Sequence, residues 1–343
     1  SGRSAAGSGR IQPYPGAAVS LQVDTVSEES IADLSFLAAM ACILEATAPK
    51  PGNVSPGRPF RDMAYSDFIA SALAAGPELA LAGERPLGAT ILAAVRATRI
   101  RTPANTNLGI ILLFAPLIAA ARRLGPDGLP RARVALVRSQ GVLGRVSAAR
   151  PGLQQSLGRV LRESTVEDAR AVYAAIREAK PGGLGTASEQ DLSAEPTVTL
   201  LEVMRLAAER DDIAAEYAGD FPLTFGVGAP AVRGAREAGL GWDDAVVETF
   251  LTLLAHRPDT LIARKLGVEA AQKISSRAVE ILAAGGVRSV TGREQLRAFD
   301  ADLRDPQNSR NPGTTADLTA AAVFRVLLDE GWLNARQRTP RAQ

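Results

Sequence analysis

Apolar side chains recur at helical spacing along almost the whole chain, and this pattern limits the fold more than any other feature. Residues three and four positions apart lie on one face of an α-helix, so each such segment predicts a helix with one buried side. The predicted helices run from Ser27 or Ser30 to Ala46 and over Tyr65–Leu79, Leu87–Ile100, Leu108–Ala121, Leu153–Leu161, Glu167–Ala179, Thr197–Tyr217, Leu223–Ala238, Trp242–Ala255, Asp259–Leu266, Val268–Ala283 and Thr315–Leu333.

Strand signals are weak by comparison. Val134–Val137 and Val287–Val290 have the composition of short strands, but neither belongs to a repeating strand–helix pattern. Aromatic residues make up 4% of the 343 residues, whereas alanine and leucine, which favour close helix packing, are abundant. We therefore predict an all-α, single-domain globule of about 11–13 helices with long polar loops. It is expected to span 27–335, between disordered tails at 1–26 and 336–343.

Composition excludes several kinds of site and partner. One histidine, His256, argues against a His-rich metal centre, and one cysteine, Cys42, excludes an intramolecular disulfide and fits a reducing cytosol. The formal net charge of +2 favours neither nucleic acid nor a membrane surface as a partner. The longest apolar stretch, Leu108–Ala121, is about fourteen residues and too short to span a bilayer. We expect a cytoplasmic protein, and any metal ion it uses to be bound by oxygen, first of all Mg²⁺.

Two polar turns near opposite ends of the chain combine helix-breaking residues with charge. The first is Pro49-Lys50-Pro51-Gly52-Asn53-Val54, followed by Arg61 and Asp62, and the second is Arg310-Asn311-Pro312-Gly313-Thr314-Thr315-Ala316-Asp317. Thr314 or Thr315 is predicted to cap the last helix. Rigid cationic donors beside carboxylates suit a phosphate with Mg²⁺, and a carboxylate in a first helical turn suits a cation. An ordinary helix-ending turn with solvated charges explains either stretch when it is taken alone.

Three further segments place polar side chains beside turn residues. Asn105-Thr106-Asn107-Leu108-Gly109 opens the most apolar helix, Lys180-Pro181-Gly182-Gly183-Leu184-Gly185 is a glycine-rich loop, and Asp259–Lys265 brings together an aspartate and two cations. The glycine loop can turn N–H groups toward an anion, but it is no Walker motif because its lysine precedes the glycines. A helix cap, a flexible linker and a charged helix face are the structural alternatives for the three segments.

Taken together, these five motifs resemble the triphosphoribosyl-dephospho-coenzyme A synthases, in the order that this family has them and over roughly residues 30–333. The Asn-Thr-Asn-Leu-Gly and Asn-Pro-Gly-Thr-Thr-Ala-Asp-Leu forms look most like the archaeal-type branch. Asn107 stands where the lyase-associated members tend to have histidine. Members of that branch also occur beside genes of tetrahydromethanopterin-linked metabolism, which leaves a pterin-like or other nucleotide precursor open as the acceptor.

The resemblance implies a transferase in which dephospho-coenzyme A attacks C1′ of the ATP ribose and adenine leaves. Mg²⁺ would accompany ATP, and alanine-rich helix faces would permit a homodimer. A related enzyme of tetrahydromethanopterin- or methanofuran-type cofactor synthesis and a non-catalytic helical binding protein are the alternatives. The resemblance and this chemistry imply phosphate contacts from Lys50, Arg61, Arg264 and Lys265, catalytic carboxylates Asp62, Asp259 and Asp317, metal ligands Glu45, Asp62 and Asp317, and nucleotide contacts from Gly52, Asn53, Asn105, Asn107, Gly182, Gly183, Asn311, Gly313 and Thr314.

Overall fold

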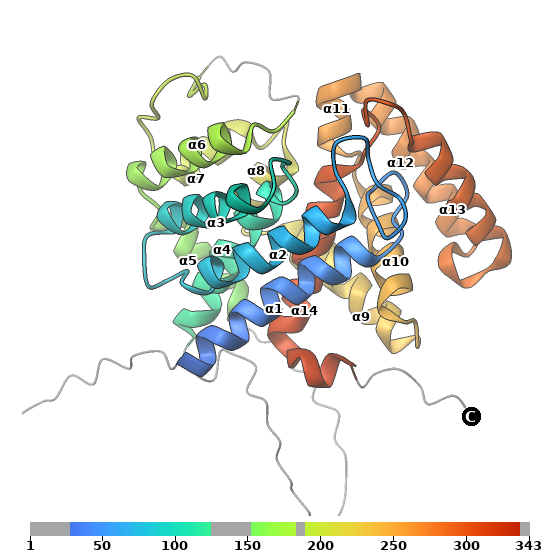
Figure 1. The fold of residues 1–343 in the computed structure, drawn as a ribbon, viewed down its shortest axis with the longest axis horizontal. Helices are drawn as coiled ribbons and strands as arrows, with labels where there is room; N and C mark the ends of the chain where they lie inside the picture. Colours follow the sequence, from blue (N-terminus) through green and yellow to red (C-terminus); the bar gives the residue numbers. More distant parts are fainter. Residues whose placement is uncertain (1–27, 125–151, 183–188, 337–343) are drawn as a thin grey trace, which may run out of the picture.

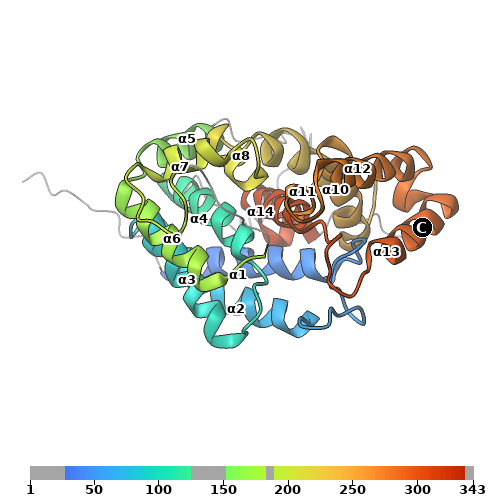
Figure 2. The ribbon, with the colours of Figure 1, turned by 90° about the horizontal axis from the view of Figure 1, so that it is seen from above.

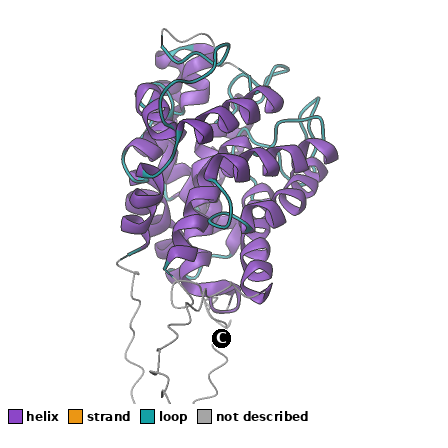
Figure 3. Ribbon diagram, turned by 90° about the vertical axis from the view of Figure 1, so that its left-hand side faces the viewer, coloured by secondary structure: helices purple, strands orange, loops and turns teal. Residues whose placement is uncertain are grey.

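The computed structural model describes residues 28–124, 152–182 and 189–336, and this part of the chain consists of helices and loops without a strand (Figure 3). The predicted all-α fold is confirmed. The expected tails and the strand at Val134–Val137 lie outside the described residues. The α-helices are α1 (Glu28–Thr47), α2 (Tyr65–Ala80), α3 (Leu87–Arg101), α4 (Leu108–Arg123), α5 (Leu153–Arg162), α6 (Val166–Ala179), α7 (Leu200–Ala207), α8 (Asp212–Ala218), α9 (Ala229–Glu237), α10 (Trp242–His256), α11 (Thr260–Leu266), α12 (Val268–Ala283), α13 (Val290–Leu303) and α14 (Gly313–Arg336).

Helix α14 is the centre around which the other helices pack. It contacts α1, α4, α9, α10 and α11, and Figures 1 and 2 show it between α3–α8 on one side and α9–α13 on the other. Its residues from Leu318 to Leu328 are almost all buried and apolar. Phe324 stacks on Phe114 of α4 with ring centroids 4.2 Å apart. A helix buried on all sides needs apolar residues all round, and this composition explains its position.

Two predicted helices have a different form in the structure. Thr197–Tyr217 divides into α7 and α8, because the Asp211 carboxylate accepts hydrogen bonds from the N–H groups of Ile213 (2.8 Å) and Ala214 (3.3 Å) and so starts a new helix. Leu223–Ala238 begins as a π-helix, η1 (Thr224–Gly228), before α9. The buried Glu216 carboxylate accepts hydrogen bonds from the main chain at the start of this turn.

The prediction of a strand at Val287–Val290 is wrong. Gly286–Arg288 forms a 3₁₀ helix, η2, and α13 begins at Val290 where the Ser289 hydroxyl accepts a hydrogen bond from the Gly292 N–H (2.9 Å). The described residues thus contain 14 α-helices, against 11–13 expected. The sequence signal was weak because α13 buries few apolar side chains.

The predicted threonine cap of the last helix is also wrong. Thr315 lies inside the first turn of α14, and its N–H and hydroxyl both donate to Asp259 Oδ2, at 2.7 and 2.8 Å. Asp259 also caps its own helix, α11, by accepting from the Ile262 N–H (3.0 Å). One carboxylate therefore starts two helices that lie far apart in the sequence. No described helix combines the length and the apolarity needed to cross a bilayer.

Candidate functional site

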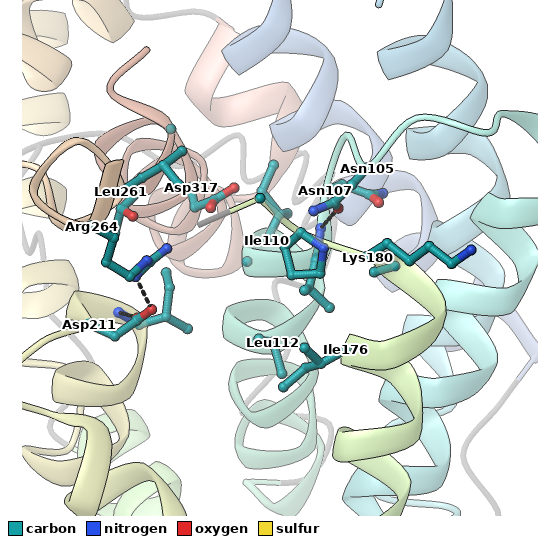
Figure 4. A pocket seen from close by; sticks show the side chains of 18 of the residues that line it. Asn105, Asn107, Ile110, Leu112, Ile176, Lys180, Asp211, Leu261, Arg264 and Asp317 are labelled. Atoms are coloured by element: carbon teal, nitrogen blue, oxygen red, sulfur yellow. Dashed lines mark hydrogen bonds and ion pairs between the residues drawn. The ribbon is translucent and has the colours of Figure 1, made fainter. Parts of the chain in front are cut away.

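A cavity of about 740 Å³ lies where the five sequence motifs meet. It is bounded by the loop after α1, the N-terminus of α4, the C-terminus of α6, helices α7, α8 and α11, and the turn that leads into α14 (Figure 4). Segments more than 250 residues apart in the sequence therefore share one site, as the hydrogen bond from Asn311 to Gly52 shows. The predicted site residues in its lining are Glu45, Asn53, Asp62, Asn105, Asn107, Gly182, Arg264, Lys265, Asn311, Gly313, Thr314 and Asp317.

Lys50 does not line the cavity. Its side chain is 1% exposed, and its ammonium pairs with the buried Glu45 carboxylate at 2.9 Å. The same ammonium donates to the main-chain oxygens of Glu45 and of Ala48 (3.2 Å). An ammonium has three N–H groups, and these three contacts use all of them. The position of Lys50 thus supports a structural role, in which it neutralises Glu45 behind the cavity wall, rather than the predicted phosphate contact.

Asp259, Arg61 and Gly52 are also absent from the cavity lining. Asp259 is 1% exposed, and its carboxylate accepts hydrogen bonds from the main chain at the starts of two helices. Its position therefore supports a structural role. Arg61 is exposed on the loop after α1. Gly183 lies outside the described residues.

The Gly52 turn is packed against protein, not left open for a ligand. Its φ is +71°, and a Cβ on this residue would come within 2.8 Å of the Leu303 Cβ. The Gly52 N–H donates to the carboxylate of Asp300 on α13 (2.9 Å). Arg304, four residues further along, donates to the main-chain oxygen of Asn53 (2.7 Å). Helix α13 therefore holds the first motif in place.

Asn53 and Asn311 join the first and last motifs at the cavity wall. The Asn311 amide donates to the Gly52 main-chain oxygen (2.8 Å) and to Asn53 Oδ1 (2.9 Å). The Asn53 amide in turn donates to the Pro51 main-chain oxygen (3.1 Å). Much of the hydrogen-bonding capacity of these two amides is thus used to fix the wall on which they lie.

Asp317 presents a half-buried carboxylate to the cavity without a partner among the described residues. It lines the cavity from the second turn of α14, not from the first turn as predicted, because the helix already begins at Gly313. None of the described residues forms a hydrogen bond or ion pair with this carboxylate (Figure 4). Burial, followed by the negative charge of Glu45, raises the pKa of the Asp317 carboxyl well above its usual range. A negative charge in such surroundings is stabilised by a cation brought by the ligand.

The Asp317 carboxylate rests directly on the backbone of Gly109 in α4. A Cβ added at Gly109 would lie 2.1 Å from Asp317 Oδ2 and 2.5 Å from its Cγ. These distances are far below van der Waals contact, so only glycine leaves the carboxylate where it is. The glycine of the second motif and the aspartate of the last are therefore one structural unit.

Gly109→Ala is expected to displace the Asp317 carboxylate and to lower the turnover number roughly tenfold or more, because a misplacement of about 1 Å in a site can cost 10²-fold. The measurement is the steady-state release of adenine, the leaving group that the family resemblance implies. The matched control is Gly234→Ala on α9, where a Cβ meets nothing within 4 Å. An unchanged turnover number in Gly109→Ala would show that the position of Asp317 does not matter for the reaction.

Positive charge lies on the α11 side of the cavity. Arg264 forms an ion pair with Asp211, and its Nε is buried with no hydrogen-bond partner in the described residues (Figure 4). Lys265 extends to the main-chain oxygen of Asn308 (3.3 Å). Lys180, which ends α6 with a left-handed φ of 48°, lines the same cavity. These cations can bind an anionic ligand.

Two amides lie at the N-terminus of α4. Asn105 Oδ1 accepts a long hydrogen bond from the Leu108 N–H (3.3 Å), and the buried Asn107 amide donates to the Thr98 hydroxyl at 3.4 Å. Both distances exceed the usual range for such bonds, so these amides can also bind a ligand. Asn107 is the N-cap residue of α4 and makes no side-chain cap hydrogen bond, so the alternative of a simple helix cap does not explain it.

Sequence reasoning missed several residues of the site. Asp211 was absorbed into a predicted continuous helix, although an aspartate before Asp212 and Ile213 is a typical N-cap signal. Asp300 and Arg304 lie outside every motif, and no local pattern reveals their contacts with the first motif.

Comparison with known proteins identifies relatives across most of the chain. A protein of Azotobacter vinelandii described as a 2-(5″-triphosphoribosyl)-3′-dephosphocoenzyme-A synthase is 28% identical over 290 residues, which are 81% of this chain and 93% of that protein. A protein of the same description from Stutzerimonas stutzeri is 33% identical over 104 residues, so the match spans 35% of its length and 30% of this chain.

A solved structure supports the same relationship. The crystal structure of an Archaeoglobus fulgidus protein described as a triphosphoribosyl-dephospho-CoA synthase superposes with a TM-score of 0.54 at 26% identity, covering 77% of this chain and 99% of that one. The sequence profile of the ATP:dephospho-CoA triphosphoribosyl transferases matches residues 31–336, which include all the cavity-lining segments. The chain therefore belongs to the ATP:dephospho-CoA triphosphoribosyl transferase family.

Proposed function

We propose that the cavity carries out the reaction for which the family is named. As a member of this family, the chain is an ATP-using transferase that joins a triphosphoribosyl group to dephospho-CoA and releases adenine. A hydroxyl oxygen of dephospho-CoA forms a bond to C1′ of the ATP ribose, and the bond from C1′ to adenine breaks. The hydroxyl proton is lost and adenine gains one, so the reaction balances without an oxidant or reductant.

The carboxylate of Asp317 is the observation that carries this proposal. Displacement at an anomeric carbon passes through an oxocarbenium-like state in which positive charge develops on the ribose. Of the cavity-lining carboxylates without a side-chain partner among the described residues, Asp317 is the half-buried one, and it lies near other negative groups. A negative carboxylate at this place attracts the positively charged transition state more strongly than the neutral ribose of the bound substrate. Binding the transition state more tightly than the substrate is the condition for accelerating the reaction. We assign Asp317 to face C1′.

The cations and amides fit the two ends of ATP. Arg264 and Lys265 on α11 bind the triphosphate, because charge-assisted hydrogen bonds to phosphate are the strong ones. Asn105 and Asn107 on α4 bind adenine and supply a hydrogen bond to the ring as it leaves. Figure 4 shows Asp317 between Arg264 and the two amides, as a residue at the reacting carbon should be.

Mg²⁺ fits this cavity as a companion of the triphosphate. The described residues bring together no group of three carboxylate, histidine or cysteine side chains that could hold a metal alone. Mg²⁺ usually binds through one or two carboxylates, waters and substrate phosphates, and Asp62 is an exposed cavity-lining carboxylate with no ion pair among the described residues. Asp62 would hold the ion, which would neutralise part of the phosphate charge. Glu45 is already paired with Lys50.

The test is to incubate the protein with ATP, Mg²⁺ and dephospho-CoA and to follow free adenine by chromatography. We expect adenine release that depends on dephospho-CoA and a product carrying the mass of the triphosphoribosyl group. ATP hydrolysis without free adenine, or no adenine at any acceptor concentration, would contradict the proposal. A pterin-like acceptor, a homodimer and a cytoplasmic location stay predictions.

A further inference from the structure

One end of the cavity is aliphatic, and the reaction at ribose uses no part of it. Four helices contribute to this wall, and Figure 4 shows Leu112 and Ile176 approaching each other between α4 and α6. Most of these side chains are otherwise buried in the core. The apolar wall consists of Ile110 and Leu112 on α4, Val172 and Ile176 on α6, Met204 on α7 and Ile213 on α8.

The apolar wall offers few hydrogen bonds to a ligand. The Tyr173 hydroxyl donates to the main-chain oxygen of Gln190, and the Tyr217 hydroxyl donates to that of Leu112 (2.6 Å). Both phenols near the wall are thus occupied by backbone carbonyls. A polar group buried without a partner costs free energy, so triphosphate, ribose and a departing base do not suit this end. An uncharged chain with aliphatic groups does.

The surroundings of the apolar wall suit a chain that is long and attached to phosphate. Leu206 lines the cavity and is 46% exposed, so this end reaches the surface and a ligand longer than the cavity can project from it. Lys180 follows Ile176 by four residues, and its ammonium forms no hydrogen bond or ion pair with the other described residues. Arg210 is a second exposed cation in the lining. A cation beside an aliphatic surface matches a phosphate joined to an apolar arm.

We infer that the apolar wall binds the pantetheine arm of dephospho-CoA and so selects the acceptor. This inference rests on the proposed function. Of the two substrates, only the acceptor has a long uncharged part, which combines methylene groups, two methyl groups and two amides. The wall fits the aliphatic portions, the open end admits the thiol terminus, and Lys180 binds the diphosphate that joins the arm to adenosine.

The experiment measures kcat/KM for dephospho-CoA and for a truncated acceptor, the terminal methyl ester of ADP, which keeps the adenosine diphosphate and lacks the arm. The variant is Ile176→Trp, which fills the space at the wall from a partly buried position. The matched control is Ile100→Trp on α3, at a residue that is 79% exposed and outside the cavity. Met204→Ala, which removes a contact without adding bulk, is the second variant.

The native protein is expected to prefer dephospho-CoA over the truncated acceptor. In Ile176→Trp this preference should fall roughly tenfold or more, since even one methylene in an apolar pocket is worth about 10- to 200-fold. The KM for dephospho-CoA should rise while the KM for ATP stays within about twofold. Met204→Ala should lower the preference in the same direction, and Ile100→Trp should not change it.

Two results would overturn this inference while leaving the proposed reaction intact. If adenine release proceeds but Ile176→Trp and Met204→Ala leave the preference unchanged, the arm lies elsewhere. If the KM for ATP rises instead, the wall holds part of ATP. If the native protein releases no adenine, the inference is tested instead by measuring the binding of dephospho-CoA by calorimetry. Weaker binding of dephospho-CoA to Ile176→Trp than to Ile100→Trp would support the inference although the proposed reaction fails. Equal binding, or no binding to the native protein, would overturn the inference too.

Discussion

Asp317→Asn is expected to lower the turnover number for adenine release about 100-fold or more while the protein stays folded. Asparagine has nearly the shape of aspartate but no negative charge, so it cannot stabilise positive charge at C1′. Removing one preorganised electrostatic contact to a transition state typically costs 10²–10³-fold. The fold should tolerate the change, because no described residue depends on this carboxylate for a hydrogen bond.

The measurement is steady-state adenine release over a range of Mg²⁺ concentrations. Asp62→Asn should raise the Mg²⁺ concentration needed for half-maximal activity, whereas Asp317→Asn should lower the maximal rate at any Mg²⁺ concentration. Asp243→Asn, at an exposed residue on α10 outside the cavity, is the matched control. If Asp317→Asn retains its rate, or if excess Mg²⁺ restores it, then Asp317 does not face C1′.

The second large effect is on stability. Lys50→Met should lower the free energy of unfolding by about 3–5 kcal/mol, because it leaves the buried Glu45 carboxylate without its partner. The Lys50 and Glu45 side chains are 1% and 4% exposed, so water cannot replace the lost ammonium. Adding Glu45→Gln to this variant should recover part of the loss, since no buried charge then remains unpaired.

Chemical denaturation followed by circular dichroism measures this difference. The matched control is Lys273→Met, which breaks an ion pair of similar length to Glu269 on α12, where both side chains are at least 75% exposed. Exposed pairs contribute about 0–1 kcal/mol, so this control should hardly change stability. Equal effects of the two substitutions would show that the Lys50–Glu45 pair is not the buried contact described. If Lys50→Met has the stability of the native protein but a raised KM for ATP, Lys50 contacts phosphate as first predicted.

The helices and the five motifs could be predicted from the sequence because both are local signals. Spacing of apolar residues by three and four positions reports on one helix at a time, and it located α1 to α6, α10 and α12 closely. It failed where the deciding contact is made by a distant residue. Thr315 looks like a cap, yet the acceptor at the start of α14 is Asp259, 56 positions earlier in the sequence.

The same limit applies to the roles of charged residues. Lys50 between two prolines has the local features of an exposed phosphate contact, and only the packing of α1 and its loop shows that it neutralises Glu45 inside the protein. Asp317 has the local features of an ordinary first-turn aspartate. Its contact with Gly109 and its enclosure among carboxylates arise because α14 passes beside α4.

The sequence by itself determined the all-α class, the motifs that bear polar groups and the family to which the chain is related. These depend on residue type and spacing along the chain. Only the tertiary structure decided which polar groups reach the cavity, which are used to build it, and that one wall is aliphatic. Those outcomes depend on which helix faces meet, and burial then sets whether a charge is paired within the protein or left for a ligand.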